Sequence, residues 1–298
     1  MLHSNLSKNL SIFLLFCSLT FSANAAYIFI PMDESQSNHL KAYGIAYYAI
    51  ERDVKVDWLL NYQGGSFLIK QHSVIENECN IRGVSYQLIA DVQSTQILQS
   101  IASPEVNQDV VRLEKAPKIA IYSPNNKQPW DDAVTLALTY AEIPYEVIYD
   151  EEVLSNLLPL YDWLHLHHED FTGQYGKFYA SFKNATWYKD QKIDYEILAK
   201  KLGYEKVSTE KLAVAKKIKE FVNGGGFLFA MCSATDSYDI ALAAEGLDIC
   251  GPMFDGDAAE LNAQEKLDFS KTLAFKNFSL VKNPNQYEFS SIDATQKR

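Results

Sequence analysis

The sequence has no run rich in lysine and arginine, and its acidic side chains outnumber the basic ones. It contains 27 lysines and arginines against 38 aspartates and glutamates, which gives a formal net charge of −11. Nucleic acids and anionic membrane surfaces are bound by basic patches, so neither is expected as a partner. Beyond the N-terminal segment there is also no apolar run of the roughly 20 residues that a transmembrane helix needs.

Motifs for nucleotide and metal chemistry are missing as well. Neither Gly64-Gly65 nor Gly224-Gly225-Gly226 forms part of a phosphate-binding loop, and no G-x-G-x-x-G follows a strand. The sequence has no H-E-x-x-H, and Asp255-Gly256-Asp257 is too short a ligand series for a calcium loop. We therefore expect neither a cofactor nor a resident metal ion.

The N-terminus has the three parts of a secretory signal peptide. A polar stretch with Lys8 is followed by an apolar run from Leu10 to Phe21 and by Ala23-Asn24-Ala25, which fits an A-x-A cleavage site. We expect residues 1–25 to be removed and the mature protein to be soluble and exported, to the periplasm or the cell exterior. An uncleaved anchor is the first alternative. Lipid attachment at Cys17 is the second, although Phe16 is bulky for that role.

The remaining chain predicts an α/β fold in two parts. Residues 27–60 read as strand, helix and strand, and residues 118–149 repeat that order, which favours parallel sheets covered by helices. The polar stretch 103–117 is the predicted boundary. It separates a small N-terminal βαβ unit, residues 26–112, from a larger domain, residues 116–298.

The larger domain continues with strands and helices around two polar or aromatic segments. A strand at 161–166 leads into His167-His168-Glu169-Asp170, and 171–195 is an aromatic stretch without periodicity. That stretch is either a lid or an ordered insertion packed on the body of the domain. A helix at 209–222, a strand at 227–231 and a helix at 234–245 follow.

Cys232 lies between the last of these strands and the helix after it. Ala230 and Ala234 are small enough to permit the tight turn that lifts a nucleophile out of a sheet, as in the G-x-S-x-G elbow. A helix N-terminus favours the thiolate, and its free N–H groups, beginning at Ser233, can hold a ligand or an oxyanion. The alternative is a buried cysteine that fills the end of the strand.

Three cysteines remain after the signal peptide, so at least one is unpaired. Three separate thiols are the favoured state. If a disulfide forms in the oxidising exterior, we expect Cys79 with Cys250, because a thiol needed for attack cannot also be held in a disulfide.

A cysteine nucleophile needs a base, and no histidine follows His168. On a strand His165 and His167 point to one face and His168 to the other, so only part of this cluster can face Cys232. If its strand neighbours that of Cys232, both carboxyl ends meet at the edge where such sheets bind ligands. The cluster could instead bind a metal with Glu169 and Asp170, or could simply bond neighbouring loops.

These residues resemble two known groups of proteins. The second domain resembles the class I glutamine amidotransferase-like superfamily, and 221–230 is similar to its trehalose-utilisation branch. The segments 32–44, 131–137 and 162–174 resemble an exported Bacteroidetes family often labelled asparagine synthetase B. The superfamily resemblance implies a flavodoxin-like sheet and a catalytic cysteine at position 232.

The resemblance also shows where this chain departs from the family pattern. Amidotransferases place the partner histidine after the nucleophile, so here His167 or His168 substitutes, the site is inactive, or the chain is truncated at its C-terminus. An N-terminal cysteine and an S-G-G-x-D-S loop are both missing, so ATP-dependent asparagine synthesis is not expected.

The sequence therefore leaves two functions open. The first is a hydrolase of an amide or related C–N bond, with Cys232 as nucleophile and His167 or His168 as base. The second is an inactive binding protein of the cell envelope that holds a ligand or partner with the histidine cluster and the aromatic stretch. His165, Glu169, Asp170 and Ser233 are the expected ligand-binding residues.

Overall fold

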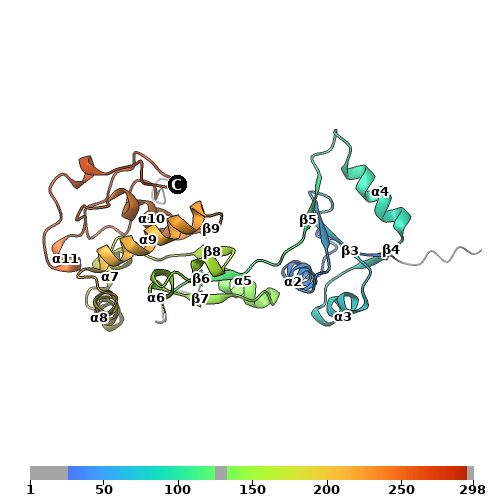
Figure 1. Cartoon of the computed structure of the whole chain (residues 1–298), viewed down its shortest axis with the longest axis horizontal. Helices are drawn as coiled ribbons and strands as arrows, with labels where there is room; N and C mark the ends of the chain where they lie inside the picture. The colour runs from blue at the N-terminus through green and yellow to red at the C-terminus, as the bar shows by residue number, and fades with distance from the viewer. Residues whose placement is uncertain (1–25, 125–132, 294–298) are drawn as a thin grey trace, which may run out of the picture. The chain divides into compact units, whose positions relative to one another are not determined.

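The computed structural model describes residues 26–124 and 133–293 (Figure 1). The predicted signal peptide, residues 1–25, lies outside these residues, as do the first two residues of the segment 131–137. The chain divides into two compact units: residues up to Ala116 together with Tyr140–Ile143, and Pro117–Thr139 together with Pro144 onward. Within the described residues, no helix combines the length and the apolar character needed to cross a membrane.

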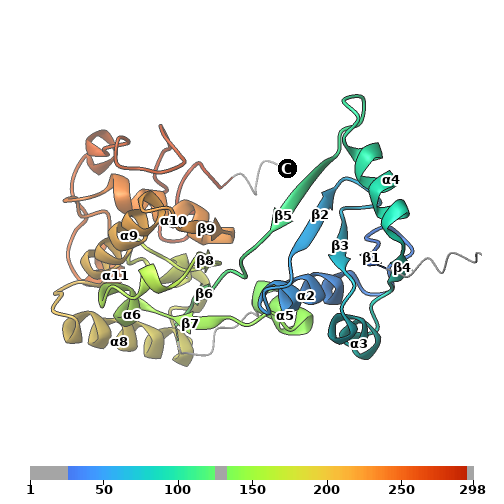
Figure 2. The same cartoon turned by 45° about the vertical axis from the view of Figure 1, so that its right-hand side comes forward.

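The first unit contains a five-stranded sheet and three helices. Its elements are β1 (Tyr27–Ile30), α2 (His39–Ile50), β2 (Val56–Leu60), β3 (Ser66–Lys70), α3 (Ser73–Arg82), β4 (Gln87–Ile89), α4 (Asp91–Ile101) and β5 (Asp109–Leu113). The strand order is β4-β1-β3-β2-β5. Figure 2 shows these elements from a second direction.

The predicted parallel βαβ unit is not confirmed in this first unit. The segment β1-α2-β2 exists, but β3 lies between the two strands and every neighbouring pair is antiparallel. The cause is the turn before β3, where Gly64 and Gly65 have φ of 80° and 93° and reverse the chain into a hairpin. The sequence pattern missed β3 and with it the partner of both strands.

The first unit is covered by helices on both faces of its sheet. Ile28, Ile69 and Val56 pack with buried residues of α2 and α3. Phe29 and Leu68, whose side chains alternate to the other face, pack with Ile101 of α4.

The second unit contains a four-stranded sheet in which all neighbouring strands are parallel. The elements before its last strand are β6 (Ile119–Tyr122), α5 (Ala133–Ala141), β7 (Glu146–Ile148), α6 (Asp150–Leu154), a 3-10 turn (Leu158–Leu160), β8 (Trp163–Leu166), a 3-10 turn (Tyr175–Lys177), α7 (Tyr179–Phe182), α8 (Thr186–Lys201) and α9 (Val207–Asn223). Then follow β9 (Phe227–Ala230), α10 (Cys232–Ala243), α11 (Pro252–Asp255) and a 3-10 turn (Ala263–Lys266).

The strand order in the second sheet is β7-β6-β8-β9. After β6 the chain forms β7 on one side of that strand. It then crosses back and forms β8 on the other side of β6. Right-handed crossovers then place α5 on one face of the sheet and the later helices on the opposite face. The predicted α/β class with a parallel sheet is therefore confirmed for this unit.

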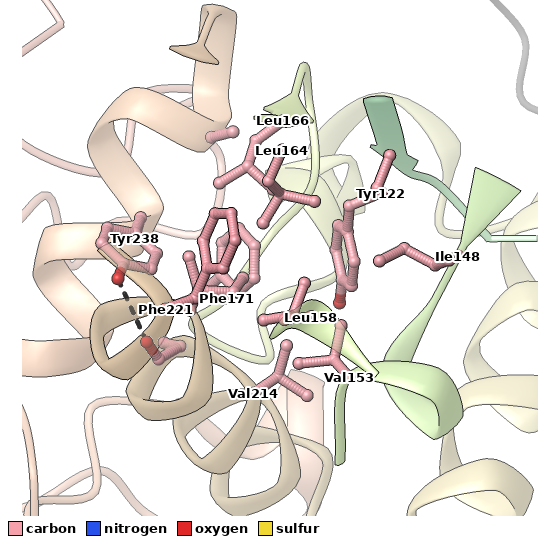
Figure 3. Close-up of a cluster of buried hydrophobic side chains, with 14 of the residues drawn as sticks. Tyr122, Ile148, Val153, Leu158, Leu164, Leu166, Phe171, Val214, Phe221 and Tyr238 are labelled. Atoms are coloured by element: carbon pink, nitrogen blue, oxygen red, sulfur yellow. Dashed lines mark hydrogen bonds between the residues drawn. The ribbon is translucent and has the colours of Figure 1, made fainter. Parts of the chain in front are cut away.

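The main core of the second unit lies between the sheet and α6, α9 and α10 (Figure 3). Leu164 and Leu166 of β8 point into it, as do Val214 of α9 and Phe171 from the loop after β8. The Tyr238 hydroxyl of α10 donates to the Ala215 carbonyl at 3.1 Å, which ties two of the covering helices together.

The aromatic stretch 171–195 is an ordered part of the unit. This agrees with the second of its two predicted alternatives, an ordered insertion packed on the body of the domain. It contains α7 and the first part of α8. Tyr175, Phe178 and Tyr188 are buried in a cluster with Cys250 and Phe254. Helical periodicity is hard to see in this sequence because its aromatic side chains pack on several sides.

Candidate functional site

Cys232 is the first residue of α10 and lies at a sharp turn after β9. Its backbone φ is +50°, in the left-handed region that a residue with a Cβ rarely adopts. The thiol belongs to an exposed residue, whereas Cys79 and Cys250 are buried, and all three cysteines are free. The structure therefore presents the Cys232 thiol at a strained strand-to-helix turn, and the buried strand-end alternative does not apply.

The histidine cluster lies next to this turn. β8 and β9 are parallel neighbours, with His165 opposite Phe229 and Leu166 opposite Ala230. The Met231 N–H donates to the Leu166 carbonyl at 2.9 Å, and the Ala234 N–H donates to the His167 carbonyl at 3.3 Å. Both strands thus end at the same edge, as the sequence predicted for neighbouring strands.

The three histidines have different environments. His165 is completely buried, and its Nδ1 lies 3.0 Å from the Phe229 carbonyl oxygen. His167 and His168 are partly exposed, with their Nδ1 atoms 2.9 Å apart. Among residues 26–124 and 133–293, no hydrogen bond reaches the Cys232 Sγ. The described structure therefore shows no imidazole hydrogen-bonded to the Cys232 thiol.

Of the other predicted ligand-binding residues, Glu169 and Asp170 follow β8, and Ser233 follows β9. Glu169 accepts the His167 N–H at 2.8 Å, and Asp170 accepts the Thr172 and Gly176 N–H groups at 2.6 and 3.0 Å. These bonds fix the loop after β8. Ser233 lies in the first turn of α10, and no hydrogen bond among the described residues uses its N–H.

An irregular C-terminal segment, residues 256–293, is fastened to α10 by two buried carboxylates. Asp239 accepts the N–H groups of Leu273, Ala274 and Phe275 at 2.7, 2.8 and 2.7 Å. Asp236 accepts the Ser290 hydroxyl at 2.6 Å. Burial raises the pKa of Asp236 to about 6.

This segment also approaches both the thiol and the aromatic stretch. Burial and then the neighbouring Cys232 raise the pKa of Tyr287. The Tyr287 ring lies 5.8 Å from that of Phe178. The buried Lys177 donates to the Val281 carbonyl at 2.7 Å, which holds the C-terminal segment against the aromatic stretch.

A small pocket lies at the same carboxyl edge, nearer β6 and β7. Its lining residues are Pro124, Tyr149, His168, Glu169, Asp170, Tyr175, Gly176, Phe178, Gln191 and Tyr195. The water-accessible volume is about 20 Å³. The pocket therefore brings three members of the predicted polar cluster together with the aromatic stretch.

A buried polar network that the sequence analysis did not identify lies next to this pocket. Lys211 of α9 donates to Asp150 at 2.5 Å and to the Tyr149 hydroxyl at 2.9 Å. Tyr122 also bonds Asp150 and receives a hydrogen bond from Lys211 at 3.0 Å. Burial lowers the pKa of Lys211, but the charges of Asp150 and Glu210 raise it by more, so this pKa lies above its usual value.

Glu210 is the second carboxylate of this network. It is 1% exposed, and among the described residues its Oε1 has no hydrogen-bond partner. Burial raises the pKa of Glu210 to about 8, although the charge of Lys211 acts in the opposite direction. A signal for these residues was present, because Lys211 occupies the apolar stripe of α9 with Val207, Val214 and Ile218.

The histidine cluster does not form a metal site in the described residues. The one group of three potential ligand atoms within 4.8 Å of one another there is Asp248, Cys250 and Asp255. Lys206 already binds both aspartates, at 2.6 and 3.0 Å. The Cys250 thiol donates to the Thr172 carbonyl at 3.2 Å. This second group is therefore a structural ion-pair cluster.

Comparison with known proteins adds no family assignment. No protein-family model, no curated protein and no solved structure matches the chain. Functional conclusions accordingly depend on the geometry of the site itself.

Proposed function

We propose that the second unit is a cysteine-dependent hydrolase of an amide or related C–N bond, with Cys232 as its nucleophile. The observation that carries this proposal is the φ of +50° at an exposed cysteine between a parallel strand and a helix. Backbone strain of this kind costs about 1–3 kcal/mol and persists where the surrounding structure enforces it, most often at functional sites. The small neighbours Ala230 and Ala234 fit the same elbow.

The chemistry needs no group beyond the protein, the substrate and water. The thiolate attacks the carbonyl carbon to form a C–S bond, and the C–N bond breaks as the amine takes a proton from the imidazolium. Water then attacks the thioester, gives a proton to the imidazole and releases the acid and the thiol. The Ser233 N–H, which has no hydrogen-bond acceptor among the described residues, lies in the first turn of the helix, where it can bind the oxyanion of each tetrahedral intermediate.

His167 or His168 is the proposed base. The His167 carbonyl accepts a hydrogen bond from the Ala234 N–H in the first turn of α10. The backbone of His167 therefore lies near the turn that carries the Cys232 thiol. Catalytic hydrogen bonds are often long or misaligned without substrate and shorten in the complex. A rotation that separates the two imidazoles would supply the base.

The proposed family and location are consistent with this site. The order β7-β6-β8-β9 corresponds to the first four strands of a flavodoxin-like sheet, in which ligands bind at the carboxyl edge. This order supports the resemblance to class I glutamine amidotransferases and to the exported family labelled asparagine synthetase B. The N-terminal sequence supports export to the periplasm or cell exterior.

The second candidate function is that of a binding protein without catalysis. The pocket lined by His168, Glu169, Asp170 and the aromatic stretch supports it. In that case the Cys232 thiol would have no special reactivity.

Labelling with an electrophilic thiol probe between pH 5 and 9 tests the proposal. We expect rapid labelling of Cys232 in the wild type, none in Cys232→Ala, and a changed pH profile in His167→Ala or His168→Ala. Cys79 serves as the internal control, because burial raises its thiol pKa to about 12. Cys232 labelling that is slow and has the same pH profile in both histidine variants would overturn the assignment.

A further inference from the structure

Residues 279–291 of the C-terminal segment form a short hairpin. Its two arms pair through backbone bonds such as that from the Val281 N–H to the Phe289 carbonyl, at 2.8 Å. Residues 282–288 make up the tip of this hairpin, and Tyr287 belongs to the tip. Two paired strands alone are only marginally stable, so the position of the hairpin depends on its contacts with the rest of the unit.

Two buried side chains fix the hairpin in place. Asp236 of α10 accepts the N–H and the hydroxyl of Ser290, at 3.1 and 2.6 Å. Lys177 of the aromatic stretch donates to the carbonyls of Val281 and Asn283, at 2.7 and 3.4 Å. The hairpin is therefore fastened both to the helix that begins at the thiol and to the aromatic stretch.

The bonds between Asp236 and Ser290 place the hairpin near Cys232. Cys232 and Asp236 are four positions apart on α10, so they lie on the same side of the helix and about 6 Å apart along its axis. Ser290 is three residues from Tyr287 in the chain. Burial and then the neighbouring Cys232 raise the pKa of Tyr287, which agrees with a phenol close to the thiol.

Tyr287 offers an aromatic surface beside this thiol. Its ring centroid lies 5.8 Å from that of Phe178, and the two ring planes make an angle of 33°. Phe178 is 7% exposed and lines the small pocket together with His168, whereas Tyr287 is 47% exposed. One buried ring thus supports Tyr287, while a large part of its own surface remains accessible. A further ring can pack against such a surface with the centroids about 4.5–7 Å apart.

We propose that Tyr287 is a specificity-determining residue of the Cys232 site, which accepts amides that carry an aromatic ring next to the scissile bond. This inference rests on the proposed role of Cys232 as nucleophile and names the class of substrate. The ring of the substrate packs against Tyr287 while its carbonyl carbon lies at the thiol. The contact depends on the ring of Tyr287 and not on its hydroxyl group.

Two alkylating probes that differ by one ring test this inference. Iodoacetamide and N-benzyl-iodoacetamide have the same reacting carbon, so the ratio of their rate constants at Cys232, benzyl probe over iodoacetamide, measures the contribution of the ring. We expect this ratio to be about fivefold higher in the folded full chain than in the same chain unfolded in urea. Peptide mass spectrometry follows Cys232 separately from Cys79 and Cys250.

Variants assign the effect to the ring of Tyr287. Tyr287→Ala should return the ratio of the folded chain to the unfolded value, and Tyr287→Phe, which keeps the ring, should retain the wild-type ratio. The matched control is Phe227→Ala, which removes an aromatic side chain that is 63% exposed at the other end of β9. It should also retain the wild-type ratio.

The ratio of the two probes and the absolute rate answer separate questions. A slow reaction with iodoacetamide would count against Cys232 as a nucleophile, whereas the ratio alone decides the role of Tyr287. That role would be overturned by equal ratios in the folded and unfolded wild type or by a wild-type ratio in Tyr287→Ala. A ratio lost in Tyr287→Phe, or lost equally in Phe227→Ala, would overturn it as well.

Discussion

The buried carboxylate of Glu210 predicts a specific dependence of stability on pH. Its pKa is raised from 4.5 to about 8 in the folded state. Between these values the folded protein retains a proton that the unfolded chain has lost, so stability falls as the pH rises through this window. At about 1.36 kcal/mol for each pKa unit, the shift corresponds to a loss of about 5 kcal/mol by pH 9.

Glu210→Gln removes this titration and preserves the shape of the side chain. We expect the variant to gain about 5 kcal/mol relative to the wild type between pH 4 and pH 9, because the neutral amide is never ionised in the core. Urea denaturation at these two pH values measures the effect. Hydrogen-exchange mass spectrometry of β8 and β9 peptides restricts the readout to the second unit.

The control for this experiment is Glu220→Gln on the same helix. Its carboxylate is 64% exposed and bonds Lys217 at 2.7 Å, so its replacement should alter the pH dependence far less. Parallel stability curves for the wild type and Glu210→Gln from pH 4 to 9 would refute the reasoning, since they would show that Glu210 binds its proton equally in both states.

Two other variants test how the second unit is held together. Lys211→Ala leaves Asp150 buried and uncompensated, so it should destabilise the unit by about 3–5 kcal/mol in urea denaturation, against about 0–1 kcal/mol for Lys217→Ala on the same helix. A loss below 1 kcal/mol for Lys211→Ala would contradict the network. Asp239→Ala frees the N–H groups of residues 273–275 and should increase proteolytic cleavage in the C-terminal segment at least several-fold. Unchanged cleavage there would show that other contacts hold this segment.

Local sequence patterns were sufficient to predict the second sheet and the turn at Cys232. Strand β9 is short and apolar, Gly224-Gly225-Gly226 ends the helix before it, and small residues flank the cysteine. These signals lie within a few residues of the features that they predict. That β8 lies next to β9 was only a condition of the sequence argument, and the pairing itself is seen only in the structure.

The parts that could not be predicted depend on contacts between distant residues. β1 and β2 look like a simple βαβ pair, but only the pairing of β3 with both makes the first sheet antiparallel. Lys211 lies in the apolar stripe of α9, which indicates that it is buried, but its partner Asp150 lies 61 residues away, so the polar network itself could not be predicted.

The central claim is that the turn makes Cys232 a nucleophile, and its alkylation rate tests this most directly. The rate constant for iodoacetamide should be measured at pH 6.5 for Cys232 in the folded protein and in the same chain unfolded in urea. The account predicts a faster reaction in the folded state, because the exposed thiol lies at the N-terminus of α10. A folded rate equal to or below the unfolded rate would contradict it.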